Sequence, residues 1–302
     1  MCMLHASLVE LASQAPLCQD AATVRGVLAE SQDLMRNAIE HNESPQDLVI
    51  WFSRVVTDVL HSDGVKSLTS GAELVLTGAV GRGDALPSSP IKWLTVGDEG
   101  VDSSPLSALI AQAGLVPDET AFGVRARTRR QWIQAIHTAD GPGLAVFADA
   151  GTWCLREVLK LEDPTVLLRE ALSHRPPRVQ LDSGLPDYSV AVDIRRGLLY
   201  PVIALARWAG VAARSTEFST RARLEAAASK QVLTRAQADY LATAWNAGLS
   251  LQLRRFADRV HRHSTTASAL PAIQRSIYGA SARMVSDVAY SLAAANDISL
   301  DV

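Results

Sequence analysis

The sequence lacks a long apolar run and a secretion signal. None of its apolar stretches approaches the roughly 18 to 20 residues that a membrane-spanning helix needs. The first residues lack a basic segment followed by an apolar stretch and a cleavage site. We therefore expect a cytoplasmic protein with no membrane partner.

Cysteine is also scarce, and basic charge is not in excess. Cys2, Cys18 and Cys154 form no CxxC pair, so we expect reduced thiols rather than disulfides or a zinc site. A formal net charge of −3 gives no general attraction to nucleic acid, and we expect no nucleic-acid partner. One local basic run is more typical of a solvated helix face than of a nucleic-acid surface, and it comprises Arg125, Arg127, Arg129 and Arg130.

What the chain does have is enough length and apolar content for two domains. It has 302 residues, 48% of them hydrophobic but only 5% aromatic. Apolar residues recur at helical spacing over residues 4–65, where Ser44 and Pro45 are typical of a helix start. Short apolar runs predict strands at 74–77, 91–96 and 144–147. A helix is predicted separately at 105–113. Beyond Gly151 the spacing is helical again, with the strongest segments at 195–208, 220–229, 234–263 and 271–295.

The most informative stretch lies between the first two predicted strands. Residues 77–94 read T-G-A-V-G-R-G-D-A-L-P-S-S-P-I-K-W-L. A glycine-rich turn in this place can bring backbone N–H groups against a phosphate. The same glycines can equally serve a tight turn, and the residues alone do not decide between these two interpretations.

This stretch resembles the nucleotidyltransferase motif of the DNA polymerase beta superfamily. The closest form is G-G-x-G-R-G-E-x-x-P-x-S-D-I-D-L-L, found in protein-PII uridylyltransferases. Asp84 stands where that form has glutamate. The identical positions are Gly78, Gly81, Arg82, Gly83, Pro87, Ser89, Ile91 and Leu94.

The later part of the chain resembles the substrate-binding domain of nucleotidyltransferases that are often fused to CBS or cyclic-nucleotide-binding domains. The matching blocks are Trp132 with residues 137–140, residues 193–202, residues 205–207 and residues 219–224. Within the second block, Asp193 with Arg195 and Arg196 can form an internal ion pair or face a cleft, and we favour the ion pair. Trp153 and Cys154 are typical of core positions. His261 and His263 lie two apart on a predicted helix, which argues against a shared metal.

The chain departs from the motif at the residues that hold metal. The resemblance implies two carboxylates, spaced D-x-D at the start of the second strand, that bind divalent ions. Here those positions are Pro90 and Lys92, whereas Ile91 and Trp93 keep the apolar face of the strand. An ammonium about 4 Å from a divalent ion repels it by roughly 8 kcal/mol at an effective dielectric constant of about 20.

Two further positions bear on catalysis. The serine that follows the first glycine in much of the superfamily is Ala79 here. The resemblance also implies a third acidic position on a later strand. We assign this position to Asp149 and interpret the residue as a catalytic relic. Asp149 can also be a strand-end residue that caps the next helix.

The sequence therefore predicts an α+β protein with a small mixed sheet of the nucleotidyltransferase type. We expect an amino-terminal helical region at 1–68, a nucleotidyltransferase-like domain at 69–150 and a helical substrate-binding-like domain at 151–302. The expected function is a regulatory pseudoenzyme that binds a nucleotide, ATP or UTP, or a protein partner. The expected nucleotide-binding residues are Gly78, Gly81, Arg82, Gly83, Asp84, Ser89 and Lys92, with no catalytic residue beyond the relic Asp149, no metal and no cofactor.

The alternative is an active transferase that moves uridylyl or adenylyl groups to a protein. It would use Asp84 and Asp149 to hold magnesium in an altered register, and only in that case do we expect Mg²⁺ as a cofactor.

Overall fold

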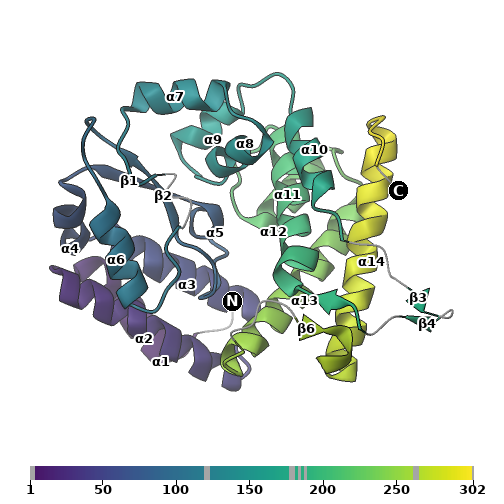
Figure 1. Ribbon diagram of the computed structural model, residues 1–302, viewed down its shortest axis with the longest axis horizontal. Coiled ribbons are helices and arrows are strands. Elements are labelled where there is room, and N and C mark those ends of the chain that lie inside the picture. The colour runs from purple at the N-terminus through teal and green to yellow at the C-terminus, as the bar shows by residue number, and fades with distance from the viewer. Residues whose placement is uncertain are drawn as a thin grey trace. The chain divides into compact units, whose positions relative to one another are not determined.

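A computed structural model describes residues 4–118, 123–176, 181–182, 185–186, 189–260 and 265–300 (Figure 1). The chain forms two compact units. The first unit contains Met1–Ala139 and Val146–Leu161, and the second contains Asp140–Ala145 and Glu162–Val302. The chain therefore passes between the units more than once. The predicted amino-terminal helical region and the glycine-rich segment both belong to the first unit.

The amino-terminal part of the first unit is helical, as predicted. Its helices are α1 (Ala6–Gln14), α2 (Ala21–Glu40), α3 (Pro45–Leu60) and the single turn α4 (Asp63–Lys66), with 3₁₀ turns η1 (Ala15–Leu17) and η2 (Ser67–Thr69). α3 begins where the sequence predicts, because the Ser44 side chain accepts a hydrogen bond from the Asp47 N–H and Pro45 occupies the first turn.

The helices α1, α2 and α3 pack against one another through fully buried side chains. Leu28 of α2 and Phe52 and Val56 of α3 have almost no exposed surface. The Trp51 indole N–H donates a hydrogen bond of 2.8 Å to the Leu8 carbonyl, which ties α3 to α1. This helical layer supplies a large part of the core of the first unit.

A short antiparallel hairpin follows, formed by β1 (Glu73–Thr77) and β2 (Lys92–Val96). Both predicted strands are confirmed, and Thr77 lies opposite Lys92 in the register. The other side of β2 carries two isolated parallel bridges, Ile91 with Pro117 and Val96 with Arg127. The pairing is therefore mixed, with β2 between β1 and two later segments of the chain.

The predicted helix at 105–113 is confirmed as α6 (Ser104–Gln112), and it is followed by α7 (Arg129–His137), α8 (Gly141–Ala148) and α9 (Trp153–Val158). The predicted strand at 144–147 is wrong, because these residues belong to α8. Four apolar residues in a row fit a buried helix as well as a strand. The Asp140 carboxylate accepts a hydrogen bond of 2.9 Å from the Gly143 N–H, which starts the helix before the apolar run.

The basic run is not a single helix face. Arg125 and Arg127 lie on an extended segment that bridges to Asp102 and Val96, and α7 begins only at Arg129. Thr128 and Gln131 form a capping box at that point, which ends the extended segment. All four arginines are exposed, in agreement with a solvated surface.

The second unit is mainly helical. Its longer elements are α10 (Thr165–Ser173), the π-helical turn η3 (Arg195–Leu199), α11 (Tyr200–Ala212), α12 (Thr220–Ser229), α13 (Arg235–Ala257) and α14 (Ala272–Ala295). α13 and α14 pack side by side, and α11 packs against both α10 and α12 (Figure 1). The short elements are β3 (Leu181–Asp182), β4 (Leu185–Pro186), β5 (Ala191–Val192), β6 (Thr265–Thr266) and η4 (Ala267–Ala269).

Two predicted helices of this unit differ in detail. The segment 195–208 begins with the π-helical turn η3, and the segment 234–263 ends as a helix at Ala257. His261 and His263 lie outside the described residues. The fold as a whole is α+β and mostly helical, as predicted.

Cys154 is a core residue of α9, as expected. Its burial raises the pKa of the thiol to about 12, so the thiol is neutral at physiological pH. Among the described residues, no helix is both long enough and apolar enough to cross a bilayer.

Substitutions in α3 test this core. Phe52 is 1% exposed and Ile50 is 52% exposed on the same helix. We expect Phe52→Ala to lower the free energy of unfolding by about 3 to 5 kcal/mol, because it leaves a cavity between packed helices. We expect Ile50→Ala to change it by less than about 1 kcal/mol. Urea denaturation followed by circular dichroism measures both, and equal losses would contradict the assigned orientation of α3.

Candidate functional site

The glycine-rich segment between β1 and β2 opens with a single helical turn, α5 (Gly78–Gly81). Gly78 and Gly83 have φ values of 62° and 74°, which lie in the left-handed region that favours glycine. The Arg82 N–H donates to the Gly78 carbonyl and the Asp84 N–H to the Ala79 carbonyl, each at 3.0 Å. Both glycines therefore have a conformational role at the two ends of this turn.

Gly81 has a different role, which is close packing. A Cβ atom at this position would lie 2.4 Å from the Asp149 carbonyl oxygen and 2.6 Å from the Leu76 carbonyl oxygen. The space that a side chain would need is thus filled by the backbone of the protein itself. This contact explains the glycine at position 81 without reference to a ligand.

Arg82 lies at the centre of a buried ion cluster. Its Nε donates to the Asp84 carboxylate at 3.1 Å, and its Nη1 donates to the Asp149 carboxylate at 2.5 Å. The three residues are only 5%, 6% and 2% exposed, respectively. One guanidinium therefore compensates two carboxylates, and it joins the turn after β1 to the residue that follows α8.

A second ion pair lies at the start of β2. The Lys92 Nζ atom is 3.5 Å from a carboxylate oxygen of Asp118, and the Lys92 side chain is 30% exposed whereas that of Asp118 is 6% exposed. Asp118 directly follows Pro117, which bridges Ile91 in parallel. The Lys92 side chain also faces Gly78, since a Cβ atom on that glycine would lie 3.4 Å from the Lys92 Cδ.

The expected site residues thus fall into three local groups. Arg82 and Asp84 join Asp149 in the ion cluster, and Gly78 lies beside Lys92. Ser89 belongs to a separate turn, in which its hydroxyl accepts a hydrogen bond of 3.0 Å from the Leu86 N–H. Asp149 follows a helix rather than the strand that we predicted.

Asp118 was not among the expected site residues. This carboxylate directly follows Pro117, which bridges Ile91 just before β2, and it pairs with Lys92. Pro117 directly precedes Asp118 and interrupts the pattern by which a strand could be predicted. Asp118 can therefore be identified only from the bridge between Pro117 and Ile91.

The helical unit has a buried polar cluster of its own. Glu170 of α10 accepts a hydrogen bond of 3.2 Å from the Tyr200 hydroxyl and lies 3.6 Å from the guanidinium of Arg207 on α11. His174, one turn further along α10, packs edge-on against the Tyr200 ring, with 4.5 Å between the ring centroids. These contacts join α10 to α11.

Asp193 accepts a hydrogen bond of 3.0 Å from the Arg196 backbone N–H, which is a helix-capping role.

The second unit is similar to a known family. Residues 166–286 match a family model described as "putative nucleotidyltransferase substrate binding domain". No significant match to a curated protein was found. The matched region runs from α10 into α14 and includes the Glu170 cluster. It relates the chain to nucleotidyltransferases through its helical unit, in the region where the sequence predicted a substrate-binding-like domain.

Removing the Arg82 guanidinium tests the ion cluster. We expect Arg82→Met to lower the free energy of unfolding by about 3 to 5 kcal/mol, because it leaves two buried carboxylates without their cation. The matched control is Arg54→Met, which breaks an exposed pair with Asp58 at 3.5 Å on α3 and should cost less than about 1 kcal/mol. Chemical denaturation of both variants at pH 7 measures the difference. A loss no larger than that of the control would show that the cluster does not stabilise the fold.

Proposed function

We propose that this chain is a non-catalytic relative of nucleotidyltransferases that acts in regulation by binding a nucleotide or a protein. The relation to nucleotidyltransferases is supported by the family match over residues 166–286 and by the glycine-rich motif at 77–94. The observation that carries the proposal is the ion pair between Lys92 and Asp118. It puts an ammonium at a position where the resembled motif has a metal-binding carboxylate.

A pair of divalent ions does not fit the residues around this turn. Lys92 lies 3.5 Å from Asp118, and Arg82 donates to both Asp84 and Asp149. A divalent ion bound by Asp118 would lie close to the ammonium and be repelled by roughly 8 kcal/mol at about 4 Å. We therefore propose no metal-dependent step and no cofactor.

Lys92 can instead serve as the cationic contact for a ligand. Its side chain is partly exposed and lies beside Gly78 at the start of the turn. An ammonium binds phosphate oxygens directly, without a metal between them. The distance of 3.5 Å to Asp118 is longer than a strong charge-assisted hydrogen bond, so the ammonium retains donors for an anion.

The alternative is an active transferase that holds magnesium with Asp84 and Asp149. Both carboxylates would then have to give up their hydrogen bonds to Arg82 in a buried setting. That rearrangement would leave the guanidinium without its partners, which is costly. We therefore favour the binding function.

Calorimetric titration of ATP and UTP tests the proposal. We expect at least one of them to bind with the same affinity in excess EDTA as in magnesium. We expect Lys92→Asp to weaken that binding by about tenfold or more, because it removes a charge-assisted contact and introduces a repulsive charge. Lys66→Asp is the matched control, since Lys66 is 67% exposed in α4, and it should leave the affinity unchanged.

Transfer assays complete the test. We expect no label from ATP or UTP, radioactive at the α-phosphate, to reach any protein of a lysate in the presence of magnesium or manganese. Metal-dependent labelling would contradict the proposal and support the alternative. If neither nucleotide binds, only a protein ligand remains, and co-purification from the same lysate with unmodified and Lys92→Asp chains would test it.

A further inference from the structure

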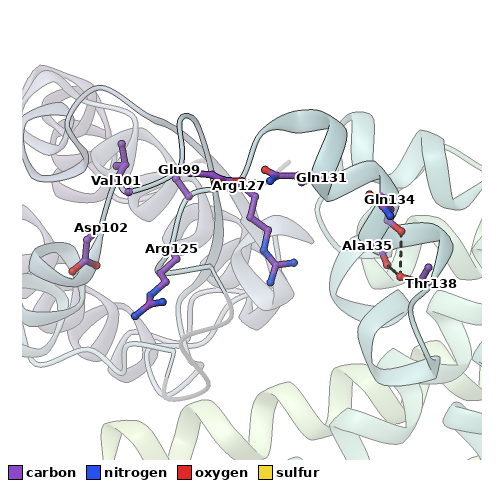
Figure 2. Close-up of a pocket in the computed structure, with 11 residues that line it drawn as sticks. Glu99, Val101, Asp102, Arg125, Arg127, Gln131, Gln134, Ala135 and Thr138 are labelled. Carbon is purple, nitrogen blue, oxygen red and sulfur yellow. Dashed lines mark hydrogen bonds between the residues drawn. The ribbon is translucent and has the colours of Figure 1, made fainter.

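A groove of about 850 Å³ lies in the first unit, away from the glycine-rich turn. One wall is formed by residues 99–102 and 125–127, and the other by the face of α7 that carries Gln131, Gln134, Ala135 and Thr138. Figure 2 shows the side chains of Arg125 and Arg127 leaving one segment and diverging toward their guanidinium ends, with the α7 residues to one side of them. The glycine-rich motif at 77–94 contains none of these residues.

The wall that carries the two arginines is held in place on both edges. The Ala126 N–H donates to the Val101 carbonyl at 3.1 Å, and the Arg127 N–H donates to the Thr95 carbonyl of β2 at 3.1 Å. Because Arg125 and Arg127 alternate with the buried Ala126, both side chains leave the same face of this segment. Their backbone positions are therefore fixed before any ligand arrives.

The second wall is also anchored. The Trp132 indole N–H donates a hydrogen bond of 3.0 Å to the Thr95 carbonyl, and this ties α7 to β2. The Arg127 guanidinium lies over the Trp132 ring, 4.7 Å from its centroid. This contact attracts the guanidinium to the face of the ring and so favours its position at this wall of the groove.

The acidic residues of the groove are satisfied by neutral donors. Glu99 accepts a hydrogen bond from the Gln131 amide, and Asp102 accepts from the Ser104 N–H at 2.8 Å and from its hydroxyl at 2.9 Å. The hydrogen bonds from Ser104, and to a lesser degree the charge of Arg125, lower the pKa of Asp102. Within the described part of the chain, neither Arg125 nor Arg127 forms an ion pair with a carboxylate.

We propose that this groove is a second anion site, which binds a small molecule with a diphosphate group through Arg125 and Arg127. Each of these two guanidinium groups lines the groove and provides a fork of N–H donors that matches phosphate oxygens in geometry and charge. The volume is within the range of about 300 to 1,000 Å³ that small-molecule sites occupy, and it leaves room for an organic part beyond the phosphates. The amide of Gln134 lines the groove as a polar contact for that part.

Calorimetric titration with inorganic pyrophosphate, and separately with ADP, tests the groove in EDTA. We expect saturable binding of pyrophosphate to the full chain and a loss of about tenfold or more in affinity for Arg125→Gln/Arg127→Gln. If ADP binds more tightly than pyrophosphate, the groove also recognises the nucleoside of ADP. If the two bind equally, the groove recognises the diphosphate group alone. Both arginines are exposed, so the double variant should keep the circular dichroism spectrum of the unmodified chain.

Two further variants sharpen the test. Arg130→Gln removes an exposed arginine from the start of α7 that does not line the groove, and it should leave the affinity unchanged. Glu99→Gln removes a negative charge from the groove and should tighten binding by about two- to fivefold. No saturable binding, equal weakening by Arg130→Gln, or weaker binding after Glu99→Gln would each overturn the proposal.

Lys92→Asp separates this site from the one proposed above. It should leave pyrophosphate binding to the groove unchanged even if it abolishes nucleotide binding at the glycine-rich turn. Loss of pyrophosphate binding in Lys92→Asp alone would overturn the second site.

Discussion

The Lys92 ammonium lies 3.5 Å from the Asp118 carboxylate at the start of β2, so this end of the sheet has a positive side chain beside a buried acid. The buried acids of the neighbouring turn are compensated in the same way, since Arg82 donates to both Asp84 and Asp149. Each of the three carboxylates thus contacts a cation of the chain itself. Lys92, whose side chain is partly exposed, is the cation that the proposed binding function assigns to an anionic ligand.

Local patterns in the sequence predict the elements of the fold better than they predict the site. Helical spacing and the Ser44–Pro45 start signal locate α3, and glycine-bounded apolar runs locate β1 and β2. The run at 144–147 gives a helix instead of a strand because four apolar residues carry no period of their own. Asp118 could not be predicted, because its place beside Lys92 depends on a long-range bridge between Pro117 and Ile91.

The two units contribute different information about the chain. The helical unit contains the matched region, where Glu170 links α10 to α11 through Tyr200 and Arg207. The first unit contains the glycine-rich turn and the arginine groove, so both proposed anion sites belong to it. In the turn, the glycines have structural reasons to be present, and Gly81 in particular packs against the Asp149 and Leu76 carbonyls. These glycines therefore have conformational and packing roles that do not require a ligand.

Manganese titration followed by electron paramagnetic resonance measures whether the site beside Lys92 binds a divalent ion. We expect the unmodified chain to leave the spectrum of free Mn²⁺ unchanged. We also expect Pro90→Asp/Lys92→Asp to bind about one ion per chain, because Asp118 then joins two new carboxylates. Adding Asp118→Asn to that variant should abolish the binding. Stoichiometric Mn²⁺ binding by the unmodified chain that is lost in Asp118→Asn would contradict the account.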